Sequence, residues 1–417
     1  MRVLLAWELG SNWGHLATLL PLAQRLRARG HEVVFSIRGL DGDLSLLTSA
    51  GFKYLAMPVA MMPLQTLHKQ PVRGYADVLA LGGFADARTL AQLVQAWLGI
   101  LHFVNPDVVV CKYAPLAEFG TRDRPVITVG TGFEMPPLTS PLPTYGLRPQ
   151  KDFDDLLEVE NGIFEAINAE SVQKKLPAVE SVADCFAHVR RFVLTYPELD
   201  HFGARKQLQY LGAAESLPTP RATSSAERAF FASASAPITF AYLRLGFVWL
   251  SEFLRIWNLQ VAPAHLIVVD PSLPSAECKS LSGKFCLVLH EPIDINTRSS
   301  VLGTVICHAG HGMVSGALSN GQRLLMMPQY LEQKMMAQRV IQSQPSAAGV
   351  ALITAPFKPE QVVEVHAALL AMDKPTTVLA YFADPIAEVV RHIEALHGKA
   401  IGGISVHTGI SRPPDSL

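Results

Sequence analysis

The chain has 417 residues, of which 49% are hydrophobic and 17% are charged, and its formal net charge is −1. This length predicts two domains, each large enough to bury its own core. The near-neutral charge disfavours nucleic-acid binding and attachment to a membrane through basic residues. The five cysteines are widely spaced, with no CxxC pair, and indicate neither a disulfide framework nor a zinc site. We therefore expect a cytoplasmic enzyme for small substrates.

The apolar stretches are too short for a signal peptide or a membrane span. The apolar run after Arg2 is shorter than the roughly 7–15 residues of a signal-peptide core. The most apolar region, Ile238–Trp257, is interrupted by Arg244 and Glu252, whereas a membrane span requires roughly 18 uninterrupted apolar residues. We expect no integral membrane association.

The start of the chain has the pattern of a β-α-β unit. Val3–Trp7 is a short, continuous apolar run, which is typical of a parallel strand covered on both faces. Apolar residues then recur at helical spacing from Leu16 to Leu26, and Gly30 is placed to end this helix. A second strand at His31–Ile37 completes the unit, whose crossover should be right-handed.

The remainder of the first half continues the α/β pattern. From Met57 to Phe103 it is mostly helical, with prolines and Gly82-Gly83 as breakers. Buried strands are expected at Pro106–Cys111 and Pro125–Val129, and a Pro-rich loop at Met135–Pro149. A last short strand is expected at Arg191–Thr195. The Pro-rich loop is expected at the carboxyl edge of the sheet, where the ligands of parallel sheets bind.

The second half repeats the pattern of the first. Strands are expected at Ile238–Tyr242, His265–Val269, Phe285–Leu289, Val305–Cys307 and Arg323–Met327, and helices after Gly312, at Gln333–Gln342 and at Glu360–Ala371. The predicted divisions are an N-terminal domain at 1–212, a linker at 213–235, a C-terminal domain at 236–380, a helix at 381–400 and a tail at 401–417. The expected fold class is α/β, with two Rossmann-like domains.

The segment Val305–Leu318 reads as a strand, a Gly-rich turn and a helix start. Glycine lets the backbone approach an anion, and the unpaired N–H groups of a helix N-terminus favour negative charge. The segment lacks the GxGxxG spacing of a dinucleotide site and the Lys-Ser/Thr pair of a P-loop. It therefore predicts a phosphate site of another kind.

With the residues that follow, this segment resembles the donor motif of family-one glycosyltransferases, which include the macrolide and UDP-glycosyltransferases. The matching residues are His308, Gly310, Gly312, Ala317-Leu318, Gly321, Pro328 and Glu332-Gln333. Near the N-terminus, Gly14-His15 and the run from Arg29 to Val33 match the same family. The resemblance implies the GT-B fold, in which two Rossmann-like domains face each other across a central cleft.

The resemblance also implies roles for individual residues. His15 would be the general base that takes the proton of an acceptor hydroxyl. The donor, a UDP- or dTDP-sugar, would be held by His308, Gly310, His311, Gly312, Met313, Glu332 and Gln333, the last two at the sugar. Glu134 is a candidate for binding the acceptor. No metal or cofactor is expected, and Asp41-Gly42-Asp43, which resembles a metal-binding DxD motif, reads as a turn.

Several positions depart from the family pattern. Met313 replaces a hydroxyl residue that usually contacts phosphate, and Gly316 replaces an acid that usually binds ribose. Lys112 stands where the family often has the aspartate that orients the catalytic histidine. Either another acid replaces that aspartate, with Glu8 and Glu134 at strand ends as the candidates, or His15 works unassisted, or the chain is a weak or repurposed catalyst.

The resemblance predicts an inverting transferase that moves a sugar from a UDP- or dTDP-sugar to a small natural product or lipid. Two alternatives remain open. One is a sugar-nucleotide epimerase of the same fold, and the other is a catalytically silent subunit that binds a nucleotide sugar and supports a partner enzyme.

Overall fold

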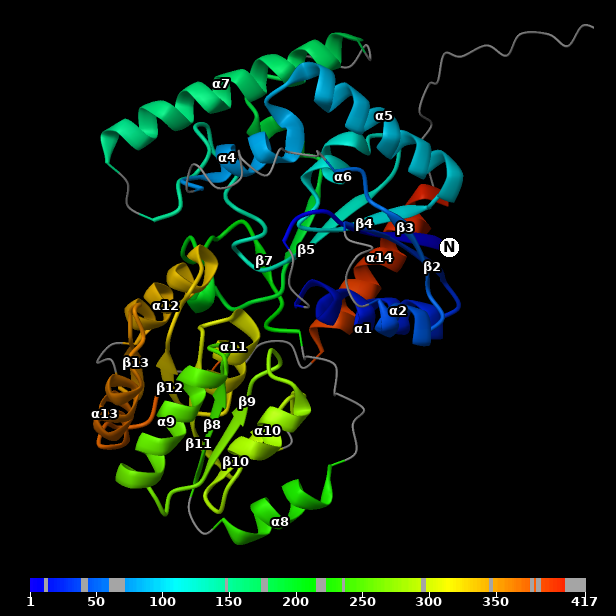
Figure 1. Cartoon of the computed structure of the whole chain (residues 1–417). Helices are drawn as coiled ribbons and strands as arrows, with labels where there is room; N and C mark the ends of the chain where they lie inside the picture. Colours follow the sequence, from blue (N-terminus) through cyan, green and yellow to red (C-terminus); the bar gives the residue numbers. More distant parts are fainter. Residues whose placement is uncertain are drawn as a thin grey trace, which may run out of the picture.

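Two parallel β-sheets, one in each half of the chain, form two α/β domains (Figure 1). The computed structural model describes residues 1–401 outside the segments 11–13, 39–43, 60–71, 147–148, 174–178, 215–222, 235–236, 294–297, 345–347, 376–378 and 380–383. Asp41-Gly42-Asp43 and the predicted tail from 402 onward lie outside the described residues. The two sheets confirm the predicted fold class.

The first sheet has seven strands in the order β3-β2-β1-β4-β5-β6-β7, and all neighbours are parallel. The strands are β1 (Arg2–Trp7), β2 (Glu32–Ile37), β3 (Lys53–Ala56), β4 (Val108–Lys112), β5 (Val126–Gly130), β6 (Arg190–Val193) and β7 (Gln209–Tyr210). Successive residues of β1 point to opposite faces of the sheet. Val3 and Leu5 belong to the hydrophobic cluster on one face, and Leu4 and Ala6 belong to the cluster on the other. Burial on both faces explains why this strand is a continuous apolar run.

The second sheet has six parallel strands in the order β10-β9-β8-β11-β12-β13. Its strands are β8 (Ile238–Tyr242), β9 (Leu266–Val269), β10 (Cys286–Leu289), β11 (Leu302–Cys307), β12 (Arg323–Met326) and β13 (Val350–Leu352). In both sheets the chain order reverses direction once near the middle, between β1 and β4 and between β8 and β11. Ligands of open α/β sheets bind outside the carboxyl ends of the strands at such points.

Helices cover both faces of each sheet (Figure 1). Those of the first domain are α1 (Gly14–Ala28), α2 (Ser45–Ser49), α4 (Tyr75–Leu79), the π-helix η1 (Ala80–Phe84), α5 (Ala87–Val104), α6 (Pro115–Gly120), α7 (Gln150–Gln173) and the 3₁₀ turns η2 (Ala183–Phe186) and η3 (Pro197–Leu199). Then follow α8 (Ser225–Ser233), α9 (Phe247–Gln260), α10 (Ser275–Leu281), α11 (His311–Ser319), α12 (Leu331–Ser343), α13 (Pro359–Leu370) and α14 (Pro385–Ile401). Within the described part of the chain, no helix is long and apolar enough to cross a membrane.

Some elements differ from those expected. The strand β3 and the long helix α7 had no predicted counterpart, and α8 lies inside the segment predicted as a linker, 213–235. The helix α7 packs on α4 and α5. Its sequence did not predict it, because its many charged residues weaken the amphipathic pattern.

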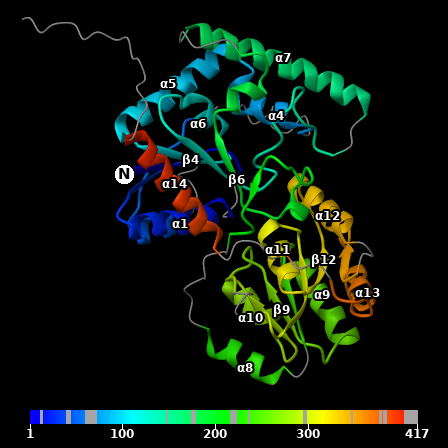
Figure 2. The ribbon, with the colours of Figure 1, turned by 180° about the vertical axis from the view of Figure 1, so that it is seen from behind.

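The last helix, α14, lies against α1 of the first domain (Figure 2). Its apolar residues Ile386, Val389, Val390 and Ile393 belong to the same core cluster as β1 and α1. At the rim of this contact, Glu394 pairs with Arg29 at 2.7 Å and lies 3.0 Å from a ring nitrogen of His31. The chain therefore finishes the first domain after it has built the second.

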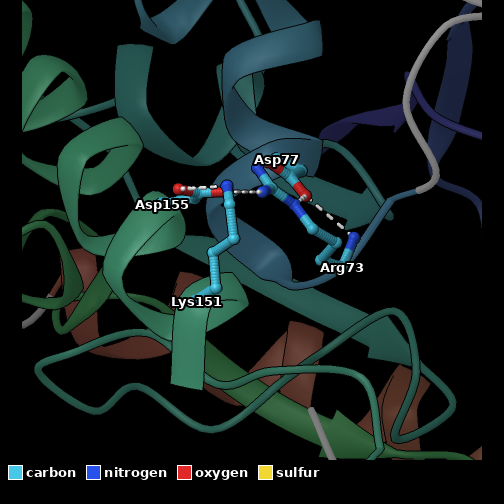
Figure 3. A network of polar contacts seen from close by, with 4 residues as sticks. All are labelled: Arg73, Asp77, Lys151 and Asp155. Carbon is cyan, nitrogen blue, oxygen red and sulfur yellow. Dashed lines mark hydrogen bonds and ion pairs between the residues drawn. The ribbon is translucent and has the colours of Figure 1, made fainter. Parts of the chain in front are cut away.

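A polar network joins the start of α4 to α7 (Figure 3). The Arg73 guanidinium donates to both carboxylate oxygens of Asp77 at 3.1 Å and to Asp155 at 3.0 Å, and Lys151 also donates to Asp155 at 3.0 Å. The backbone carbonyl of Arg73 accepts from the Tyr145 N–H at 2.8 Å. The network thus holds the Pro-rich loop after β5 against the helical layer of the first domain.

Candidate functional site

Three polar side chains meet at the carboxyl edge of the first sheet, on both sides of the point where the strand order reverses. His15 lies in the first turn of α1, which follows β1. Lys112 is the last residue of β4, and Glu134 lies in the turn that follows β5. Because β1, β4 and β5 are adjacent in the sheet, their ends bring these side chains together.

Glu134 bridges His15 and Lys112. Its Oε1 lies 3.0 Å from Nδ1 of His15, and its Oε2 accepts from Lys112 Nζ at 2.5 Å and from the Thr131 N–H at 2.7 Å. Burial alone would raise the pKa of Glu134, but the Lys112 ammonium and His15 lower this pKa well below its usual value. The carboxylate therefore stays ionised, and it orients the His15 ring by holding Nδ1 towards Glu134.

Of the two acids considered as partners of His15, only Glu134 lies at the ring. Glu8 instead accepts a hydrogen bond from the Leu116 N–H at 2.7 Å inside the core of the first domain. Burial, opposed by that hydrogen bond, raises the pKa of Glu8 from 4.5 to about 8. Glu8 is therefore a buried carboxyl group of the core.

The imidazole of His15 is packed on several sides. Its ring stacks on Trp7 at a centroid distance of 5.1 Å and on Tyr113 at 6.3 Å. Gly10, with φ +82°, lies so close that a Cβ there would be 2.2 Å from Nε2. Only glycine fits this position, because it needs both a left-handed backbone and the space beside the ring. The ring orientation is thus determined by packing as well as by Glu134.

The predicted anion site lies at the corresponding edge of the second sheet. Gly310 is the N-cap of α11, with extended φ and ψ, and its carbonyl accepts the first intrahelical hydrogen bond from the Val314 N–H at 3.0 Å. The N–H groups of His311, Gly312 and Met313 therefore have no intrahelical acceptor. Gly312 is exposed, and no atom lies within 4 Å of a Cβ placed on Gly310. An anion can approach these N–H groups closely.

The His308 side chain is already occupied by the protein. Its Nδ1 donates to the Met327 carbonyl at 2.8 Å, and its Nε2 accepts from the Arg244 N–H at 3.0 Å. Burial lowers the pKa of His308, which keeps the ring neutral for this pair of bonds. The resemblance implied that His308 holds the donor directly, but its ring joins the loops after β8 and β12 and has no free nitrogen for a ligand.

This arrangement brings Arg244 to the anion site. Arg244 is exposed in the loop after β8, the strand that pairs with β11, and its charge contributes to lowering the pKa of His308. Among the residues that the structure describes, no carboxylate pairs with its guanidinium. A cation in this loop, whose backbone bonds to the residue that precedes the Gly-rich turn, adds favourable charge for a phosphate-bearing ligand at the start of α11.

Two contacts join the edges of the two domains. His311 Nε2 lies 2.6 Å from Thr195 Oγ1, and His201 Nε2 lies 3.4 Å from Glu332 Oε1. Burial and the nearby His201 and Lys112 lower the pKa of His311 to about 3, so this ring is neutral. Since Lys112 also influences His311, the His15 cluster and the start of α11 share one electrostatic environment.

The predicted acid–amide pair has divided roles. Glu332 lies in the first turn of α12 and is partly exposed at the domain interface. The Gln333 side-chain carbonyl accepts from the Gln329 N–H at 2.9 Å and from the Tyr330 N–H at 3.3 Å. This amide carbonyl caps its own helix, so a ligand could be contacted only through the amide nitrogen of Gln333.

The sequence did not identify Thr195, His201 or Arg244 as site residues. Each follows a strand of one of the sheets, and the rule that ligands bind at carboxyl strand ends is the signal that could have found them. Across the described ranges, no group of three or more His, Cys, Asp or Glu side chains is arranged to hold a metal ion.

Comparison with known proteins gives matches in structure and not in sequence. No family model matches the chain, and no curated protein matches it by sequence. The solved glycosyltransferase VinC in complex with dTDP has a TM-score of 0.60 at 14% identity, covering 96% of this chain and 98% of that one. SnogD from Streptomyces nogalater, also a glycosyltransferase, has a TM-score of 0.56 at 16% identity, covering 95% of this chain and 99% of that one.

A third match is the spinosyn rhamnosyltransferase SpnG, solved both with thymidine diphosphate and with spinosyn aglycone. The TM-scores are 0.55 and 0.54, at 17% identity, with 97% of this chain and 100% of that chain covered. At identities this low, a structural match shows the fold. The chain therefore has the two-domain GT-B fold of these glycosyltransferases, as its sequence predicted.

Proposed function

We propose that the chain is an inverting glycosyltransferase that moves a sugar from a nucleoside-diphosphate sugar to a hydroxyl of a small natural product. The observation that carries the proposal is the pairing of His15 with the buried, ionised Glu134, close to the accessible N-terminus of α11. A base held by a carboxylate and an anion site on the facing domain are the two parts that such a transfer requires.

The donor is a dTDP-sugar or a UDP-sugar. We favour the thymidine nucleotide because structural neighbours of this chain were solved with dTDP. The diphosphate would be held by the N–H groups of His311, Gly312 and Met313 together with the Arg244 guanidinium. These groups would compensate for the hydroxyl that usually contacts phosphate and that Met313 replaces. This charge arrangement supports a donor site that works without a metal ion.

The proposed reaction uses both domains. Glu134 Oε1, 3.0 Å from Nδ1 of His15, favours the tautomer that carries its proton on Nδ1, so Nε2 keeps a lone pair and can take the proton of the acceptor hydroxyl. The acceptor oxygen bonds to the anomeric carbon as the bond from that carbon to the diphosphate oxygen breaks. The nucleoside diphosphate leaves with the bond's electron pair, stabilised by the helix N-terminus, and attack from the opposite face inverts the configuration.

The same comparison supports a small natural product as the acceptor. SpnG was solved with spinosyn aglycone, and in this chain a cluster of aromatic side chains borders His15. Tyr113 contacts the ring of Phe133 at 6.2 Å, and Phe133 stacks on Tyr145 at 5.1 Å. Tyr113 and Tyr145 are buried and support Phe133, and Phe133, which is only partly buried, would offer an apolar contact to a small aglycone.

The test combines donor binding with transfer. Calorimetry with dTDP- and UDP-sugars measures donor affinity, and mass spectrometry with a panel of aglycones detects the glycosylated product. We expect His15→Ala to lose transfer by a factor of roughly 10²–10⁴ and to keep donor affinity. His102→Ala, on the exposed last turn of α5, is the control. Wild-type turnover in His15→Ala would overturn the assignment of the base.

The alternatives give different results in the same assays. Interconversion of the sugar nucleotide without any acceptor would identify an epimerase. Donor binding with no turnover of any aglycone would support a silent subunit. The ionised partner of His15 favours the transferase over the silent subunit. Burying the charges of Lys112 and Glu134 lowers the stability of the fold, and such destabilising arrangements are found mostly at catalytic sites.

A further inference from the structure

His201 is a buried histidine with unused hydrogen-bonding capacity. It follows η3 in the first domain, and none of its side chain is exposed. Neither ring nitrogen makes a hydrogen bond within the described residues, although Nε2 lies 3.4 Å from Oε1 of Glu332 in the second domain. Buried polar atoms nearly always make a hydrogen bond, so two buried ring nitrogens without one indicate a ligand or a functional role.

The backbone that carries His201 is held firmly. The neighbouring Asp200 is fully buried and accepts hydrogen bonds from the Arg205 guanidinium at 2.7 and 2.9 Å and from the Tyr210 hydroxyl. Arg205 also donates to the Met135 carbonyl at 2.8 Å, which ties this loop to the one that carries Glu134. His201 is therefore positioned in advance, as a group that contacts a ligand must be.

The ring itself lies between the candidate base and the candidate donor residues. It contacts Phe133 at a centroid distance of 5.6 Å, and it lies close enough to His311 to contribute to the low pKa of that residue. Glu332, which it faces, is the residue expected to bind the donor sugar. The groups around His201 thus belong to both halves of the proposed site.

We propose that His201 contacts the donor sugar together with Glu332, so that the first domain completes the sugar subsite of the second. This inference rests on the proposed function. A sugar hydroxyl can donate to the carboxylate of Glu332 and accept from a ring N–H of His201 at normal distances of about 2.8 Å from both. A carboxylate can only accept, so the imidazole supplies the donor that Glu332 lacks.

The pairing also gives selectivity among donors. A sugar that bears the bridging hydroxyl satisfies both side chains, whereas a deoxy sugar leaves the buried ring of His201 without a partner. The ligand class is therefore a hexose with a hydroxyl at the contacted carbon. A series of deoxy analogues of dTDP-glucose identifies that carbon.

The experiment compares the affinity for dTDP with that for dTDP-glucose by calorimetry on the full chain. His201→Phe keeps the ring and its contact with Phe133 and removes both nitrogens. We expect dTDP to bind this variant as it binds the wild type, and dTDP-glucose to bind roughly 3- to 10-fold more weakly. His201→Gln, which can still donate and accept, should recover part of the loss, and His102→Phe is the matched exposed control.

A double-mutant cycle with Glu332→Gln separates a shared contact from two independent ones. We expect the combined loss for dTDP-glucose to be clearly smaller than the product of the two single losses. Equal weakening of dTDP and dTDP-glucose in His201→Phe would indicate a structural role and overturn the proposal, as would unchanged affinity for both. Failure of the wild type to bind any nucleotide would instead overturn the proposed function, and this inference with it.

Discussion

Replacing Glu134 with glutamine removes one charge from the His15 cluster and leaves the shape of the side chain almost unchanged. In the wild type, Lys112 Nζ and the Thr131 N–H both donate to Oε2. In the Glu134→Gln variant these two donors will hold the amide oxygen of the new side chain, so its NH2 group will face Nδ1 of His15. Nδ1 must then accept, the ring proton moves to Nε2, and the ring can no longer take the acceptor proton.

The expected loss follows from that change of tautomer. A general base contributes roughly 10²–10⁴ in rate, or about 3–5 kcal/mol of barrier, and Glu134→Gln should lose most of it. The variant should also be less stable by about 3–5 kcal/mol, because Lys112, which is buried, loses its counter-charge. Single-turnover transfer measures the first effect, and urea unfolding measures the second.

A second variant separates the two effects. Lys112→Met combined with Glu134→Gln removes the buried unpaired cation, so stability should recover while transfer stays low. Affinity for dTDP should change far less than transfer in both variants, since neither residue lies at the start of α11 and their charges act on it only from a distance. Transfer by Glu134→Gln at the wild-type rate would refute the argument that Glu134 selects the tautomer of His15.

Three further predictions concern other parts of the structure. Gly10→Ala should lower transfer at least tenfold with little change in dTDP affinity, because the new methyl group would displace the His15 ring; single-turnover rates and calorimetry measure both. Arg244→Ala should weaken dTDP about tenfold or more and reduce the salt dependence of binding, whereas unchanged affinity at low salt would exclude Arg244 from the anion site. Glu8 has a pKa raised from 4.5 to about 8, so the folded chain keeps a proton that the unfolded chain loses between these values. Its contribution to stability is complete below about pH 4.5 and is lost as pH rises through 8, by at most about 5 kcal/mol. Urea unfolding across this range should therefore show a flatter pH dependence for Glu8→Gln than for the wild type.

The strands at the core of each sheet were predictable from the sequence. The expected strands at Val3–Trp7 and His31–Ile37 agree with β1 and β2 to within one residue. A buried parallel strand is a continuous apolar run, and glycine-containing loops limit it on either side. The start of α11 was predictable for a similar reason, since its glycines mark the turn.

The partners of the site residues were not predictable to the same degree. Glu134 and Glu8 were equal candidates to orient His15, because both follow strands of one sheet. The difference depends on the turn after β5, where the Thr131 N–H and Lys112 aim Glu134 at the ring. His201 had no signal of its own, because its role depends on a residue more than a hundred positions away.

The return of α14 to the first domain has a consequence for synthesis. The apolar surface of α1 and β1 that α14 covers is made at the beginning of translation, but its cover is made at the end. Until then, a nascent chain exposes that surface, and a chaperone or a neighbouring polypeptide can bind it. A fragment that stops before Pro385 should therefore aggregate, and adding the helix as a separate peptide should restore its solubility.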